Sequence, residues 1–200
     1  MSKIKAQSTC IACSVFKLEL QLLQKRGEID LLLRFLDSSL HMKPMELRKH
    51  LTFHVKNELK KNNSVIIVFG DCSPHMIEME EYPNVTRTRG RNCCEIILGR
   101  EVYEKHLKDG CFFLMPEWSA RWREYFQFQL GLDKNIIPDF MNDLHSKILY
   151  LDTGVIPLPT KDLKAFSDYC NLPYETMKVS LEHLLLSIHE TETQSNKEIE

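Results

Sequence analysis

The sequence predicts an α/β fold: a mostly parallel, doubly wound sheet with helices on both faces. The first indication is the uncharged run Val65–Gly70, dominated by β-branched residues. Such a run is typical of a strand buried on both faces. The second is the alternation of strand-like runs and helical periodicities along the chain. A polar cluster, Asp71, Cys72 and His75, comes directly after Gly70, at the end of the strand where ligands bind in open α/β sheets, so we look for a site there first.

The first half of the chain is organised around this strand. Ser14 can cap a helix, and Pro44 suits the first turn of another. The Leu-rich run Ile29–Leu36 fits either a strand or a helix. The elements expected here, in chain order, are a weak strand near Gln7–Ala12, a helix from Ser14, the ambiguous run Ile29–Leu36, a helix from Pro44 to about Lys61, the central strand Ser64–Gly70 and a short strand at Val85–Thr88.

The second half continues the alternation. Asn92 can cap a helix that passes through Gly99 towards Lys108, and Gly110 ends it. Further elements are expected as a strand at Cys111–Met115, helices at Glu117–Leu130 and Pro138–Lys147, a strand at Ile148–Leu151, and two helices from about Thr160 and Tyr174. We therefore expect one α/β domain over residues 1–190 and a frayed polar tail over residues 191–200.

Composition limits the classes of function. Two hundred residues with a net charge of −2 suit a single domain, and this charge gives no reason to expect nucleic acid or an anionic membrane as a partner. No apolar run reaches membrane-spanning length, because charged residues interrupt Leu20–Leu36, and the N-terminus lacks the apolar core of a secretory signal. A cytoplasmic protein is expected, in which the seven cysteines are thiols or metal ligands.

Three of the cysteines follow predicted strands. Cys13 follows the first strand, Cys72 follows the central strand, and Cys93 opens the helix after the strand at Val85–Thr88. If these strands are parallel, the three thiols lie along one rim of the sheet, where they could bind zinc or hold an iron–sulfur cluster. The alternative is that all seven cysteines are scattered, buried apolar side chains, because none of their spacings is a known metal signature.

Other polar and aromatic residues suggest further sites. Four arginines surround Gly90 and could hold a phosphate or carboxylate, although a solvated edge is an equal alternative. They are Arg87, Arg89, Arg91 and Arg100. Trp118 and Trp122 are one helical turn apart and fit the core or a pocket wall. The chain has no Walker loop, dinucleotide-binding glycine motif, nucleophile elbow or zinc-protease motif.

The order of several short motifs resembles an uncharacterised family of α/β proteins from methanogenic archaea and bacteria, whose members are often encoded near corrinoid-dependent methyltransferases. The resemblance extends over nearly the whole chain. The motifs that carry it are Ala12-Cys13 with Glu19-Leu20, Leu40-His41 with Pro44 and Leu47, Phe69-Gly70-Asp71-Cys72, Arg89-Gly90-Arg91-Asn92-Cys93-Cys94-Glu95, Leu98-Gly99 with Tyr103, Phe112-Phe113-Leu114 with Pro116 and Trp118, and Leu172-Pro173-Tyr174-Glu175.

The resemblance implies a site as well as a fold. The family pattern favours three cysteines, which match Cys13, Cys72 and Cys93, and it also contains His41 and Glu95 as further ligands or acid/base groups. We expect the segment from Arg87 to Arg91 to line the same cleft, and we assign cofactor contacts to Arg89, Arg91 and Trp118. This sequence departs from the pattern at Cys94, where an aromatic residue is usual, and at Ser73, where a glycine is common.

Three functions remain open. The first is a zinc or iron–sulfur protein of corrinoid-linked methyl-group metabolism, with a substrate atom at an open metal position and Glu95 or His41 moving protons. The second is a non-catalytic accessory protein that contacts components of a corrinoid methyltransferase. The third is a metal-free protein in which Arg89 and Arg91 bind a small anion.

Overall fold

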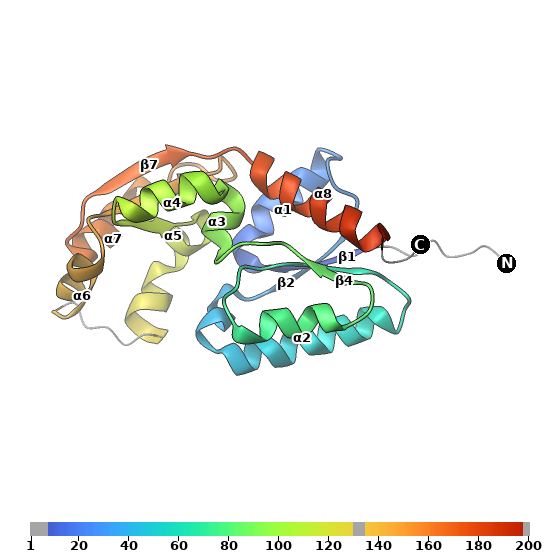
Figure 1. Ribbon diagram of the computed structural model, residues 1–200. Helices are drawn as coiled ribbons and strands as arrows, with labels where there is room; N and C mark the ends of the chain where they lie inside the picture. Colours follow the sequence, from blue (N-terminus) through green and yellow to red (C-terminus); the bar gives the residue numbers. More distant parts are fainter. Residues whose placement is uncertain (1–7, 130–134, 198–200) are drawn as a thin grey trace. The chain divides into compact units, whose positions relative to one another are not determined.

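The computed structural model describes residues 8–129 and 135–197, which divide into two compact units, each with its own parallel sheet (Figure 1). The first unit comprises residues 1–97 and 182–200, and the second residues 98–181. The α/β fold class is confirmed. The described strands form two sheets, because local periodicity predicts strands but does not say which strands share a sheet. The single domain expected over residues 1–190 stays a prediction. Among the described residues, no helix has both the length and the apolar character needed to cross a bilayer.

The sheet of the first unit has the order β2-β1-β3-β4, and all of its neighbouring strands are parallel. β3 (Val65–Val68) lies between β1 (Thr9–Cys13) and β4 (Val85–Arg87), and β2 (Leu32–Leu36) forms the far edge. All four residues of β3 are fully buried. The interior position predicted for this strand is therefore confirmed, and the ambiguous Leu-rich run is a strand.

Helices cover both faces of this sheet (Figure 1). α2 (Pro44–Leu59) packs on one side with Leu47, Leu51 and Val55 buried, whereas α1 and α8 lie on the other. The remaining bounds are η1 (Ser14–Phe16), α1 (Lys17–Lys25), η2 (Ser38–Met42), η3 (Pro74–Glu81), α3 (Cys93–Leu98) and α8 (Glu182–Lys197).

The sheet of the second unit has the parallel order β5-β6-β7, with β6 (Lys147–Asp152) in the middle. An aromatic core that includes Phe112, Phe126 and Phe166 packs beside it. The other bounds are α4 (Arg100–Lys108), β5 (Cys111–Leu114), α5 (Pro116–Arg123), the π-helical η4 (Glu124–Gln129), α6 (Ile137–Leu144), α7 (Thr160–Cys170) and β7 (Tyr174–Lys178).

Three expectations differ from the structure. The helix predicted from about Tyr174 is wrong, because Tyr174–Lys178 pairs with β6 as strand β7 and the helix begins at Glu182. The helix predicted through Gly99 is broken there, where a φ of 75° ends α3 and starts α4. Residues 191–197 continue α8 instead of fraying, and Thr191 is buried. The ends of the predicted elements at Gln7 and Leu130, and the tail at residues 198–200, lie outside the described residues.

Candidate functional site

The three predicted cysteines follow three neighbouring strands of the first sheet. Cys13 is the last residue of β1, Cys72 lies in the loop after β3, and Cys93 begins α3 in the segment after β4. Because these strands are adjacent and parallel, their carboxyl ends share one edge of the sheet. The topology thus brings the three residues to one rim, as the sequence predicted.

The thiols of these residues are in contact through Cys93. The Cys93 thiol lies close enough to the thiols of Cys13 and Cys72, and to the backbone amide of Gly70, to interact with all three. The contact with Cys13, together with burial, raises the pKa of Cys93 well above its ordinary value. The contact with Cys93 and burial likewise raise the pKa of Cys72. Without a cation, Cys72 and Cys93 are therefore held as neutral thiols.

A close approach of two backbones holds the Cys72 loop against the start of α3. A Cβ atom built on Gly70 would lie less than 3.0 Å from the N, Cα and C atoms of Asn92. Beside this contact, the Asp71 amide donates to the Gly90 carbonyl at 2.9 Å. Only a residue without a side chain allows the two segments to meet this closely. Gly70 is therefore a structural requirement for the contact between Cys72 and Cys93.

Glu95 stabilises the start of α3. Its backbone amide donates to the Asn92 side chain at 3.0 Å, as expected for a helix N-cap. Its carboxylate accepts from the backbone amide and the Nε of Arg91, at 3.0 and 2.8 Å. This reciprocal arrangement is similar to a capping box. The contacts of Glu95 fix the segment that carries Cys93, and its assignment as an acid/base group stays a prediction.

His41 belongs to a turn attached to the residue after Cys13. The Ser38 amide, at the start of η2, donates to the Ser14 side chain at 2.8 Å. The Nδ1 of His41 lies within hydrogen-bonding distance of the Ser38 carbonyl, which can only accept, so Nδ1 carries the proton. In neutral imidazole, that tautomer has its lone pair on Nε2, the arrangement used by metal-ligating histidines. A role for His41 as a ligand stays a prediction.

The arginines after β4 are bound to carboxylates of the same chain. The buried Arg87 bridges Asp71, next to Cys72, and Glu80. Arg89 binds both oxygens of Glu80, at 2.8 and 2.6 Å. Arg91 binds Glu95, as described above. These guanidinium groups hold the loops of the rim in position, and each would have to exchange a carboxylate partner to bind an external anion.

Removing the Arg87 guanidinium should strongly destabilise the first unit. Arg87→Met leaves the carboxylates of Asp71 and Glu80 without their buried partner, so we expect a loss of about 3 kcal/mol in the free energy of unfolding. Arg89→Met is the matched control, because this exposed side chain pairs with the same Glu80, and it should cost less than about 1 kcal/mol. Equal losses in chemical denaturation would contradict this assignment.

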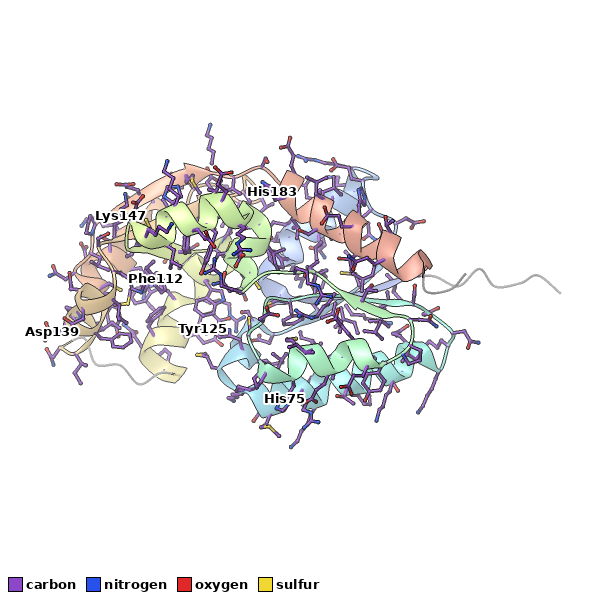
Figure 2. The ribbon with its side chains drawn as sticks, viewed as in Figure 1. His75, Phe112, Tyr125, Asp139, Lys147 and His183 are labelled. Carbon is purple, nitrogen blue, oxygen red and sulfur yellow. The ribbon has the colours of Figure 1, made fainter. Side chains whose placement is uncertain are left out.

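The structure places Trp118 in the second unit. Its ring stacks on Tyr125, which is labelled in Figure 2, with centroids 4.5 Å apart. The guanidinium group of Arg121 lies over the Tyr125 ring, 4.8 Å from its centroid. Trp118 is thus part of an aromatic and cationic cluster of α5 and η4, and its assignment as a cofactor-binding residue stays a prediction.

The sequence predicted Cys94 to be a buried apolar side chain, but its thiol interacts with that of Cys72. Burial raises the pKa of the Cys94 thiol to about 12, and the charge of a Cys72 thiolate contributes to the shift. A fourth sulfur is therefore within electrostatic reach of Cys72. The direct neighbourhood of Cys93 and Cys94 in the sequence was the signal that could have suggested it.

The contacts among Cys13, Cys93 and Cys72 do not have the geometry of a metal centre. Among the described residues, no group of three or more His, Cys, Asp or Glu side chains is arranged to hold a metal ion. The observed contacts run in a line, from Cys13 to Cys93 to Cys72. A bound metal would therefore require these side chains to turn towards a common centre.

Comparison with known proteins gives a family and no function. A family model described as "Protein of unknown function (DUF1638)" matches residues 35–186. This range contains His41, Cys72, Cys93 and Glu95, and it begins after Cys13. No curated protein and no solved structure matches the chain.

Proposed function

We propose that this chain, which belongs to the DUF1638 family of proteins of unknown function, binds a metal centre through Cys13, Cys72 and Cys93. The observation that supports the proposal is the contact of three thiols from the ends of three adjacent parallel strands. Thiolates are preferred ligands of zinc and of iron–sulfur clusters. Three of them leave a fourth coordination position of zinc, or one iron of a cluster, for another ligand.

The raised pKa values of Cys72 and Cys93 are compatible with such a centre. Metal binding deprotonates cysteine, and the cation then offsets the repulsion between neighbouring thiolates. The Gly70 amide favours the Cys93 thiolate, and the backbone amide of Cys72 favours its own thiolate. These two amides would continue to stabilise the Cys93 and Cys72 thiolates after metal binding has removed the thiol protons. His41 and Cys94 are the residues of this chain that could complete the coordination.

The biological role proposed for this centre is in corrinoid-linked methyl-group metabolism. The resemblance to proteins encoded near corrinoid-dependent methyltransferases supports it. An enzyme would admit a substrate atom at the open position, with His41 or Glu95 moving protons. An accessory protein would use the same centre to contact methyltransferase components. The alternative is a metal-free protein in which Arg89 and Arg91 bind a small anion. It has less support, because both arginines already bind carboxylates of this chain.

Purification without oxygen, followed by metal and sulfide analysis, tests the proposal. We expect about one zinc per chain, or iron together with acid-labile sulfide. Protein that stays metal-free after incubation with zinc, and with iron and sulfide, would contradict the metal site. Turnover of methylated amines or a methylated corrinoid by the loaded protein would distinguish an enzyme from an accessory protein.

A further inference from the structure

A second candidate site lies between α2 and η3 of the first unit, and none of the cysteines is among its lining residues. These two helices pack against each other, and a cavity of about 720 Å³ opens between them. In Figure 2, His75 marks the start of η3 beside α2. Cavities of this size are typical of sites for small organic molecules.

One wall of the cavity is a single face of α2. Its side chains recur at helical spacing, from Met45 through Phe53 to Lys56. The opposite face of the helix packs against the sheet with Leu47 and Leu51. Phe53 is 62% exposed and Met45 is 56% exposed, although both line the cavity. A ligand that covered them would remove apolar surface from water.

Cations lie on both sides of Phe53 along this face. Lys49 precedes it by one helical turn and Lys56 follows it by one turn, and both line the cavity. The interactions of the described residues include no carboxylate partner for either lysine; Lys56 lies 5.9 Å from the centroid of the Tyr82 ring. Arg48, by contrast, is bound by Glu78 at 2.8 Å, and that carboxylate also holds His75. Glu81 is the other carboxylate of the lining.

We propose that this cavity binds a small organic anion with an aromatic or aliphatic body. The apolar body covers Phe53 and Met45, and the anionic group pairs with Lys49 or Lys56. Tyr82 adds a second ring to the wall. Because Glu78 is already neutralised by Arg48, the lining has a surplus of cations for such a ligand. The proposal does not depend on a metal at the three thiols.

Fluorescence titration of the full chain with anilinonaphthalene sulfonate, an aromatic anion, tests this proposal. We expect saturable binding at a single class of site that weakens as salt is added. Phe53→Ser should weaken binding by at least about tenfold, and Lys49→Glu or Lys56→Glu by roughly threefold to tenfold. Phenylnaphthylamine, an uncharged aromatic probe, should bind less tightly than the anion.

Matched controls separate this site from general surface binding. Lys60→Glu changes the charge at the end of the same helix outside the cavity lining, and Leu186→Ser removes an exposed apolar side chain of α8. Both should bind the anion as the unmodified chain does, and thermal unfolding of every variant should confirm that it is folded. The proposal fails if binding does not saturate, if the controls weaken it as much as the cavity variants, or if the uncharged probe binds equally well.

Discussion

Replacing Cys93 by Ser should abolish metal binding, with a loss of affinity of at least about 100-fold. Cys93 contacts both other thiols, so its removal breaks both contacts of the cluster. Cys13→Ser and Cys72→Ser each remove one of the two thiols that contact Cys93, and these variants should also lose most of the metal. Competition with a chromophoric chelator under anaerobic conditions measures the affinity of each variant.

Two buried cysteines provide the controls. Burial raises the pKa of Cys10 and of Cys170 to about 12, and neither residue belongs to the rim cluster. Cys10→Ser and Cys170→Ser should therefore retain bound metal wherever the variant stays folded, as judged by circular dichroism. Retention of metal by Cys93→Ser, or its loss in folded Cys170→Ser, would contradict the assignment of ligands.

Replacing Gly70 by Ala should cost about 3 kcal/mol in the free energy of unfolding and weaken metal binding as well. The added methyl group would overlap backbone atoms of Asn92, and backbone cannot move aside as the end of a flexible side chain can. The Cys72 loop and the start of α3 would then separate. Chemical denaturation and chelator competition, done on the same preparation, measure both effects.

Gly27→Ala is the matched control for this prediction. A Cβ atom at Gly27 would meet no atom within 4 Å, so only its left-handed φ of 73° opposes the substitution. The expected cost is about 1 kcal/mol, with metal affinity unchanged. If Gly70→Ala were no more costly than Gly27→Ala and bound metal normally, the close approach would not be what holds the two loops together.

The sequence predicted the centre of the first unit well because its signals are local. The β-branched run at Val65–Val68 could be accommodated only as a buried strand, and the cysteines at the strand ends followed from the parallel alternation. Local signals therefore sufficed to predict the fold class and the rim position of Cys13, Cys72 and Cys93.

The remaining features depend on contacts between distant residues. Tyr174–Lys178 has no periodicity that distinguishes a short exposed strand from a helix, and its pairing with β6 decides the outcome. Similarly, nothing local indicates that Arg87 is buried between Asp71 and Glu80, or that the four-stranded and three-stranded sheets are separate. The spacing of Gly70 and Asn92 in the sequence also gives no sign of their contact.

X-ray absorption at the metal edge of anaerobically loaded protein tests the proposed centre most directly. For zinc, we expect three sulfur neighbours at about 2.3 Å and one lighter ligand. In Cys72→Ser, the zinc that remains bound should have one sulfur neighbour fewer. Four sulfurs would indicate that Cys94 completes the site. A first shell made only of oxygen and nitrogen would contradict metal binding by Cys13, Cys72 and Cys93.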